Sequence, residues 1–152
     1  MVEWGMQAAV AGDVEAVAAL KAVVMRGDLE RLGRWDEDRA RQRVRERFDP
    51  AWTWIIEVDG AFGGSVALRP EGDAHWLEHF YLDPRYQGAG IGAAVLRRLL
   101  DRCDRDGTLV RLDVLQGSAA RRLYERHGFV FVSEDPIDVF MARTPRTVTP
   151  QR

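Results

Sequence analysis

The segment that decides the fold reads Phe80-Tyr81-Leu82-Asp83-Pro84-Arg85-Tyr86-Gln87-Gly88-Ala89-Gly90-Ile91-Gly92-Ala93-Ala94-Val95-Leu96. A β-prone run ends at a proline turn, three glycines follow at alternate positions, and a helix-forming run comes next. Glycines in this pattern expose backbone N–H groups, and the start of a helix adds free N–H groups and the positive end of its dipole. The segment therefore predicts a binding site for a phosphate or pyrophosphate.

The composition is typical of one soluble globular domain. The chain has 152 residues, of which 46% are hydrophobic and 30% charged, and its formal net charge is −2. This charge gives no electrostatic reason to expect nucleic acid or an anionic membrane as a partner. Because there is one cysteine, no signal peptide and no apolar run of ~20 residues, we expect a cytoplasmic protein.

Hydrophobic periodicity predicts two helices in the first third of the chain. The first begins after Asp13 as N-cap and ends at Gly27. Its apolar face comprises Val14, Val17, Leu20 and Val23. The second spans residues 36–48 and is highly charged. Its narrow apolar stripe comprises Ala40, Val44 and Phe48.

The remaining pattern predicts strands at 52–58, 61–68, 76–82, 109–115, 129–132 and 139–142, and helices at 90–105 and 119–126. Asp59-Gly60 indicates a hairpin, Gly63-Gly64 a bulge or close backbone approach, and residues 70–73 a turn. Three consecutive strands favour an antiparallel meander, and the strand–helix–strand unit favours a parallel pair. We therefore expect one α/β (α+β) domain over residues 1–143 with a mixed sheet, and a loose polar tail over 144–152.

The glycine segment has two other interpretations. Gly88-x-Gly90-x-x-Ala93 also fits a dinucleotide fingerprint, with Asp113 as the ribose-binding acid. However, residues 83–87 separate the strand from the first glycine, and too little chain follows Asp113 for a doubly wound sheet. A turn that binds nothing is disfavoured, because each glycine weakens a helix by up to ~1 kcal/mol relative to alanine.

Two motifs in order resemble the GNAT acetyltransferase superfamily. The segment Gln87-Gly88-Ala89-Gly90-Ile91-Gly92 matches its Gln/Arg-x-x-Gly-x-Gly/Ala signature, and Leu82-Asp83-Pro84 matches the end of the preceding strand. Ser118 and then Leu123-Tyr124-Glu125-Arg126-His127-Gly128-Phe129 match a second motif, which begins with Asn in the family. Gly117 is the other position that could align with this Asn. The resemblance implies about four helices, a splayed parallel strand pair, and transfer of an acetyl group from acetyl-CoA to a primary amine in a ternary complex.

The resemblance also implies cofactor-binding roles. The backbone of the glycine loop would hold the pyrophosphate of coenzyme A, and the strand before it would pair with the pantetheine arm like a missing strand. The N–H of Leu82 would face the thioester oxygen. The cofactor-binding candidates are Phe80, Leu82, Gln87, Gly88, Ala89, Gly90, Ile91, Gly92, Ala93, Ser118 and Arg121. Ser118 has a shorter reach than the family Asn.

Catalytic roles follow from the same resemblance. Tyr124 matches the tyrosine near the thioester sulfur, and a phenol is a reasonable proton donor to a thiolate whose pKa is roughly 8.5. A half-buried tyrosine that packs under the helix is the alternative. Glu78 is placed like the proposed base of some members. Asp113 and His79 are further candidates, and a water chain would need no dedicated base.

The acceptor remains open at this stage. In the family its site is built from the first two helices, their connecting loop and the central strands. Here these segments carry Trp35, Trp52, Trp54 and Trp76 together with Asp36, Glu37 and Asp38. A non-catalytic acyl-CoA sensor or regulatory domain is the alternative function, because Ser118 departs from the motif. The family commonly dimerises, so a homodimer is allowed.

We expect no metal, since the three histidines lack the spacing of metal ligands. Cys103 lies on the apolar stripe of the loop helix with Ile91, Val95 and Leu99. It is therefore expected to be a small buried hydrophobe.

Overall fold

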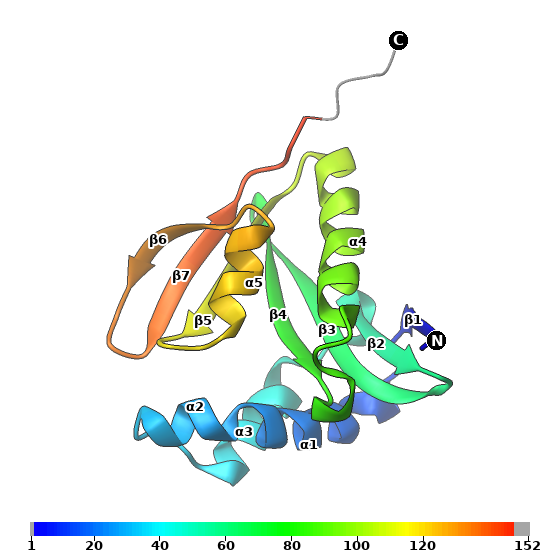
Figure 1. The fold of residues 1–152 in the computed structure, drawn as a ribbon, viewed down its shortest axis with the longest axis vertical. Helices are drawn as coiled ribbons and strands as arrows, with labels where there is room; N and C mark the ends of the chain where they lie inside the picture. Colours follow the sequence, from blue (N-terminus) through cyan, green and yellow to red (C-terminus); the bar gives the residue numbers. More distant parts are fainter. Residues whose placement is uncertain (1, 148–152) are drawn as a thin grey trace. The chain divides into compact units, whose positions relative to one another are not determined.

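The computed structural model describes residues 2–147. Within this range, seven strands form a mixed sheet of order β1-β2-β3-β4-β5-β7-β6, in which β4 and β5 run parallel (Figure 1). The strands are β1 (Trp4–Ala8), β2 (Thr53–Val58), β3 (Ala61–Glu71), β4 (Ala74–Leu82), β5 (Leu109–Leu115), β6 (Val130–Glu134) and β7 (Asp138–Arg143). The helices are α1 (Val14–Val24), α2 (Arg26–Arg31), α3 (Glu37–Arg47), α4 (Ile91–Asp106) and α5 (Ala120–Arg126). The predicted α/β class and mixed sheet are confirmed.

The chain divides into two compact units. The first contains β1, β2, most of β3, helices α1 to α3, and the part of β4 from Leu77 onward. The second contains the start of β4, nearly all of α4, and the elements from β5 to β7.

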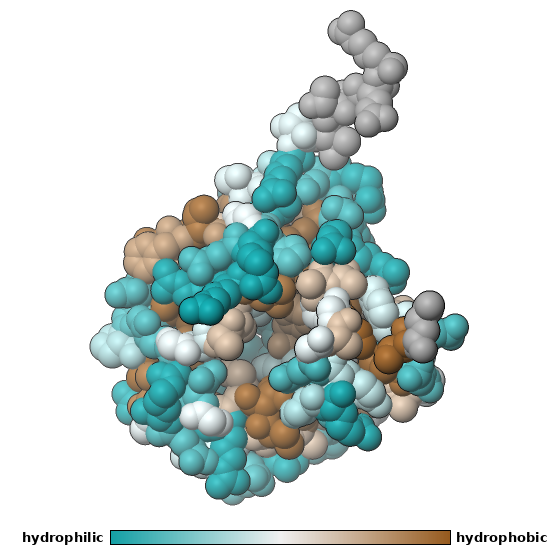
Figure 2. Space-filling model, viewed as in Figure 1, coloured by the Kyte–Doolittle hydropathy of each residue, from teal (hydrophilic) through white to brown (hydrophobic). Residues whose placement is uncertain are grey.

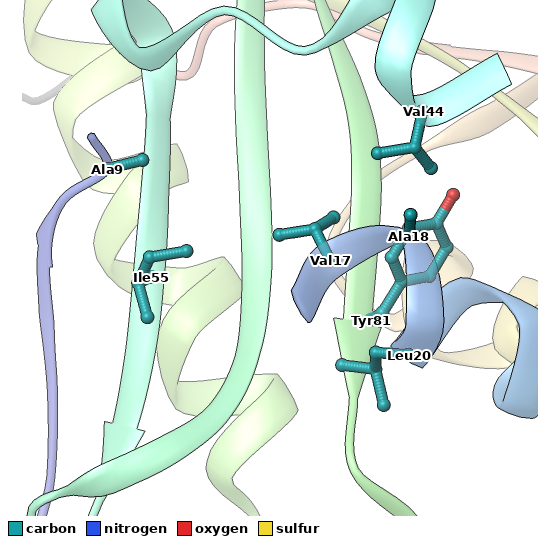
Figure 3. Packing of buried hydrophobic residues seen from close by; sticks show 7 residues of the cluster. All are labelled: Ala9, Val17, Ala18, Leu20, Val44, Ile55 and Tyr81. Atoms are coloured by element: carbon teal, nitrogen blue, oxygen red, sulfur yellow. The ribbon is translucent and has the colours of Figure 1, made fainter. Parts of the chain in front are cut away.

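An apolar cluster forms the core of the first unit. Side chains from α1, α3, β2 and β4 meet there, and Figure 3 shows Val17 and Leu20 of α1 beside Tyr81. The buried members are Ala9, Val17, Ala18, Leu20, Val44, Ile55 and Tyr81. The predicted apolar faces of α1 and α3 are thus largely confirmed, because both supply residues to this core.

Two details of the first helix prediction are wrong. Val23 is 61% exposed, because the buried stripe of α1 runs through Val17 and two full turns later reaches Val24. Gly27 is not a stop: α1 ends at Val24, and the short helix α2 continues through Gly27. Gly27 has no left-handed φ, so it does not terminate a helix in the way a C-terminal glycine does.

The hairpin and glycine bulge in β2 and β3 are confirmed. Asp59 and Gly60 have φ values of 50° and 81°, as a two-residue hairpin turn requires. The register then shifts, so that Ile56 pairs with Gly64 while Glu57 pairs with Phe62, which leaves Gly63 as the bulged residue. The predicted turn at residues 70–73 is shorter than expected, because β3 continues through Pro70 to Glu71.

In the second unit, β4 and β5 pair in parallel over Ala74–Trp76, and β5 and β6 both pair antiparallel with β7. The α4 stripe prediction is confirmed, since Val95, Leu99 and Cys103 are all buried. Strand β6 is one of the two edge strands of the sheet. It exposes Val130, Phe131 and Val132, and apolar side chains gather over it in Figure 2.

The segment after β7 has no helix or strand over Thr144–Thr147. It is nevertheless held to α4, since the backbone N–H of Arg146 donates to Asp104 Oδ1 at 2.8 Å. The rest of the predicted tail, residues 148–152, lies outside the described residues.

Candidate active site

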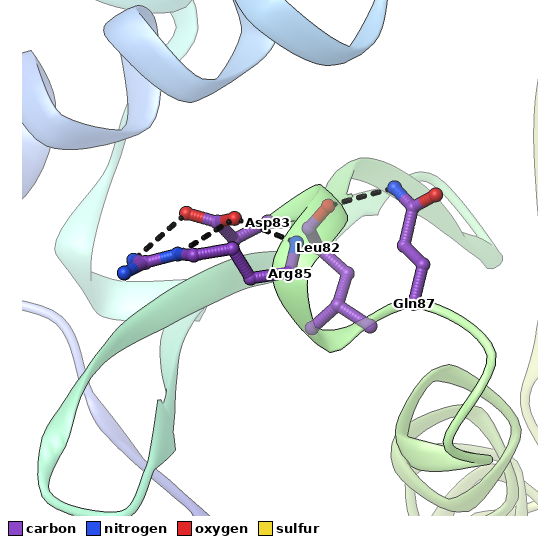
Figure 4. A network of polar contacts seen from close by, with 4 residues as sticks. All are labelled: Leu82, Asp83, Arg85 and Gln87. Carbon is purple, nitrogen blue, oxygen red and sulfur yellow. Dashed lines mark hydrogen bonds and ion pairs between the residues drawn. The ribbon is translucent and has the colours of Figure 1, made fainter.

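A short turn joins the end of β4 to the glycine loop. Pro84–Tyr86 form one turn of 3₁₀ helix, and Asp83 Oδ1 accepts the backbone N–H of Arg85 at 2.9 Å. The Arg85 guanidinium pairs with the same carboxylate at 3.1 Å, as Figure 4 shows. These bonds to Arg85 lower the pKa of Asp83 below its usual value. The carboxylate therefore fixes the direction in which the chain leaves the strand.

The side chain of Gln87 braces the loop against the strand. Its Nε2 donates to the backbone carbonyl of Leu82 at 2.9 Å (Figure 4). The backbone N–H of Asp83 donates to the carbonyl of Gly63 at 2.8 Å. These two hydrogen bonds fix the start of the glycine loop relative to β4 and β3. The Gln87 amide is therefore already engaged with the backbone of Leu82.

The glycine loop has the geometry of an anion site. Gly88 and Gly90 both have φ of 83°, and no atom lies within 4 Å of the place where a Cβ would stand on either. Helix α4 begins at Ile91, whose side chain is buried. The N–H groups of its first turn, which includes Gly92 and Ala93, have no carbonyl partner within the helix. Bare backbone and a helix start therefore suit a pyrophosphate.

The strand before the loop is irregular at His79. This residue has φ of 49°, a left-handed conformation that is uncommon outside glycine. Its carbonyl accepts the Ser65 hydroxyl at 2.7 Å. Phe80 and Leu82, the candidates for the pantetheine arm, follow this irregularity and are half-buried.

The candidate base Glu78 is engaged in an ion pair. Both of its carboxylate oxygens contact Arg69 Nε, at 3.1 and 3.3 Å, and the Glu78 side chain is 15% exposed. The neighbouring His79 has a different character. Burial, and after it the charges of Lys21, Arg47 and Arg69, lowers the pKa of His79 to about 4. Its imidazole is therefore neutral at pH 7.

Tyr124 lies in the last turn of α5 and is 9% exposed. Its ring meets Phe129 edge to face, with 5.7 Å between the ring centroids. Burial, and to a smaller extent the charge of Asp113, raises the pKa of Tyr124 well above its ordinary value. The side chain is thus a buried, protonated phenol with a proton to donate.

Two cofactor candidates near Tyr124 have structural partners. The Ser118 hydroxyl accepts the backbone N–H of Ala120 at 3.2 Å, at the start of α5. Arg121 lies 3.8 Å from the Glu125 carboxylate and 5.9 Å from the centre of the Phe131 ring. Ser118 thus bonds to the backbone at the start of α5, and Arg121 lies beside Glu125 on the same helix and Phe131 of β6.

The candidate residues fall into two groups. Glu78 and the candidates from Phe80 to Ile91 belong to the first unit, whereas Gly92, Ala93, Ser118, Arg121 and Tyr124 belong to the second. Within the first group the structure brings Leu82 and Gln87 together.

Several residues of the predicted acceptor site also contact other residues of the chain. Asp36 caps α3 by accepting the Arg39 N–H at 3.0 Å, and Glu37 lies 3.5 Å from Arg41. The Trp35 ring lies under the guanidinium of Arg26, 5.5 Å from it. Trp52 has a buried indole N–H with no partner among residues 2–147. Asp36 and Glu37 thus have local structural roles at the start of α3.

In the described part of the chain, no group of three or more His, Cys, Asp or Glu side chains is arranged to hold a metal ion. Nor does the same part contain a helix long and apolar enough to cross a membrane.

Curated relatives match part of the chain. Spermine/spermidine N(1)-acetyltransferase of Bacillus subtilis is 36% identical over 66 residues, which are 39% of this chain and 41% of that protein. Mycothiol acetyltransferase of Beutenbergia cavernae is 36% identical over 99 residues, which are 60% of this chain and 33% of that protein. The matched regions thus span 41% or less of these relatives' own length.

Solved structures match nearly the whole chain. PaiA N-acetyltransferase from Thermoplasma acidophilum, in complex with coenzyme A, superposes with a TM-score of 0.75 over 93% of this chain and 99% of that one, at 18% identity. Ribosomal-protein-S18-alanine N-acetyltransferase from Escherichia coli superposes with a TM-score of 0.73 over 98% and 97%, also at 18% identity. At such identities these likenesses show the fold alone.

The family is shown by a match along the sequence itself. A protein-family model described as an acetyltransferase (GNAT) domain matches residues 23–140, which include the glycine loop, Ser118 and Tyr124. This is well over half of the chain. The chain belongs to the GNAT acetyltransferase family.

Proposed function

We propose that this chain is an N-acetyltransferase that moves an acetyl group from acetyl-CoA to a primary amine, by direct attack of the amine in a ternary complex. The observation that carries the proposal is the glycine loop, with Gly88 and Gly90 both at φ 83° and open space beside each. When bound, the coenzyme would supply the acetyl group as a reactive thioester. The family match supports the acetyltransferase class of this proposal.

The binding role falls chiefly on the backbone. The N–H groups from Gly88 to Ala93 would donate to the pyrophosphate, and Phe80 and Leu82 would bind the pantetheine arm. Successive N–H groups of an extended strand point to opposite edges. Because the N–H of Asp83 donates to Gly63, that of Leu82 points away from β3, where it is available to stabilise a developing oxyanion.

Two side chains would handle protons. Tyr124 would donate its Oη proton to the leaving sulfur. Burial raises its pKa, so the phenol is protonated at neutral pH. Glu78 is the candidate base, with its carboxylate oriented by Arg69. His79, neutral at pH 7, is the second candidate, and a water chain is the third.

The test uses the purified full chain with acetyl-CoA and a panel of amines: spermidine, free amino acids and a peptide with a free N-terminus. Mass spectrometry detects the acetylated product. Tyr124→Phe should lower kcat by about a hundredfold or more, within the range for general acid catalysis, and leave acetyl-CoA binding intact.

The matched control is Tyr86→Phe, which removes a hydroxyl from a half-buried tyrosine. This variant should keep the wild-type kcat. Normal turnover in Tyr124→Phe would refute the acid assignment. Binding of acetyl-CoA without any acetylated amine would instead favour a non-catalytic sensor.

A further inference from the structure

A buried ion pair in the second unit joins β7 to α4. Arg143, at the end of β7, contacts Asp104 of α4 through both terminal nitrogens, at 2.7 and 3.0 Å. The two side chains are 5% and 9% exposed. Asp104 Oδ1 also accepts the backbone N–H of Arg146 at 2.8 Å. The carboxylate is therefore the anchor for the segment that follows β7.

The same guanidinium holds the end of α5. Arg143 Nε donates to the backbone carbonyl of His127 at 2.8 Å, and His127 is the C-cap of α5. Three bonds thus tie one arginine to two helix ends. Figure 1 shows β7, α5 and the C-terminal part of α4 gathered in this unit.

The end of α5 is in turn built around Tyr124. The backbone N–H of Phe129 donates to the Tyr124 carbonyl at 3.1 Å, and that of Gly128 donates to Glu125 at 3.1 Å. This is a Schellman motif, and the edge-to-face contact of Tyr124 with Phe129 is the apolar pair that accompanies it. The His127 carbonyl, which accepts the hydrogen bond from Arg143, is therefore part of the motif that sets the position of Tyr124.

Gly128 leaves room for this arrangement. It has φ of 93°, and a Cβ there would stand 2.6 Å from Arg146 Nη2 and 3.4 Å from Arg143 Nε. The helix end is thus packed directly against the two arginines.

The energetics suggest a role in geometry. A buried ion pair is often no more stabilising than an apolar pair of the same volume, so its presence is weak evidence for a stability function. Helix α5 has seven residues, and a helix this short depends on its anchors for its position. Three directed bonds from one planar guanidinium supply such an anchor.

We propose that Arg143 is a positioning residue for Tyr124: by bonding to the His127 carbonyl and to Asp104, it holds the last turn of α5, and with it the phenol, in the reactive place. This inference rests on the proposed function, in which Tyr124 is the proton donor. Arg143 itself acts only through Tyr124.

The first arm of the test needs no activity. The full chain is labelled with 3-fluorotyrosine, and its three tyrosines give three ¹⁹F signals, of which Tyr124→Phe identifies one. Arg143→Lys keeps the positive charge but removes the planar guanidinium that makes the three bonds. It should shift or broaden the Tyr124 signal and leave that of Tyr86 unchanged. An unchanged Tyr124 signal in the folded variant would overturn the proposal.

The second arm is a double-mutant cycle. Arg143→Lys should lower kcat by about tenfold, in line with the sensitivity of catalysis to small misplacements, while the KM for acetyl-CoA stays within about twofold. In a Tyr124→Phe background the same substitution should change kcat by less than about twofold, because the group it positions is absent. An equal fall in both backgrounds would refute the inference.

Asp106→Asn is the matched control, because it breaks an exposed pair with Arg102 on the same helix. It should leave kcat and the Tyr124 signal unchanged. If Arg143→Lys does not fold, Asp104→Asn replaces it in both arms. Failure of the wild type to acetylate any amine would count against the proposed function, whereas the ¹⁹F arm would still decide the positioning role.

Discussion

Gly64 of β3 lies directly beneath the backbone carbonyl of Tyr81 on β4. A Cβ at position 64 would collide with that oxygen and stand 3.2 Å from the Cα of Leu82. Both obstacles are backbone atoms, which cannot rotate away as a side chain does. The two strands therefore approach this closely only because residue 64 is glycine, one residue after the bulge at Gly63.

Gly64→Ala should destabilise the protein by roughly 1–3 kcal/mol, as overpacking against fixed atoms does. It should also weaken acetyl-CoA binding, since the displaced backbone is that of Leu82. Urea denaturation and calorimetric binding measure the two effects. Gly27→Ala is the control, because no atom lies within 4 Å and the residue is in a helix. The control should be neutral or slightly stabilising. Equal stability of the two variants would contradict the close approach.

Gly88→Ala and Gly90→Ala should each weaken acetyl-CoA binding more than they weaken the fold. Both positions have φ of 83° and open space, so the cost to folding is the strain of a left-handed residue, about 1–2 kcal/mol. The added methyl also covers backbone that would face the pyrophosphate. Gly72→Ala, at φ 61° in the β3–β4 turn, imposes similar strain away from the loop. Titration calorimetry should show normal binding for this control. A matching loss in all three variants would assign the effect to strain alone.

Stability should fall on mild acidification because of His79. The folded-state pKa of about 4 lies below the ordinary 6.5, so the unfolded chain takes up a proton first. This contribution is complete above pH 6.5 and is lost as the pH falls toward 4, with a total of about 3 kcal/mol. His79→Asn does not titrate and tolerates the left-handed φ. Urea midpoints at several pH values should therefore show a shallower slope for the variant, and an identical slope would exclude His79 as the cause.

Asp104 should add a second acid transition at lower pH. The hydrogen bond from Arg143 lowers the pKa of Asp104 below 3.8, and the Arg146 N–H acts in the same direction against the effect of burial. Since the folded-state pKa is depressed, this stabilisation is present above pH 3.8 and is lost as the pH falls through the lower folded value. Thermal melts of wild type and Asp104→Asn should thus converge below pH 3.8.

Removal of one partner of this buried pair at neutral pH, as in Arg143→Met, should lower the free energy of unfolding by about 3–5 kcal/mol. Urea denaturation measures this loss.

The features that the sequence predicted correctly have local causes. The Asp59-Gly60 turn needs two left-handed residues in a row, and the bulge follows from two adjacent glycines. The start of α4 follows from the glycine loop and the apolar stripe behind it. Each of these features depends on a few residues that are neighbours in the sequence.

The features that were missed depend on distant contacts. Arg143 and Asp104 are 39 residues apart, and nothing near either residue marks it as buried. The left-handed φ of His79 goes with a bond from Ser65, on another strand. Likewise, the prediction that Gly27 ends the first helix was wrong, because a glycine ends a helix in this way only when it adopts a left-handed φ.

The burial of Cys103 has a practical consequence for the assay. It is the chain's one cysteine, it is 4% exposed, and burial raises the pKa of its thiol. Reaction with a thiol-specific dye requires an exposed thiolate, so the native protein should contribute almost no colour. Free coenzyme A released during turnover can then be followed directly in solution. The same thiol, once it does react, reports the rate at which α4 opens or the protein unfolds.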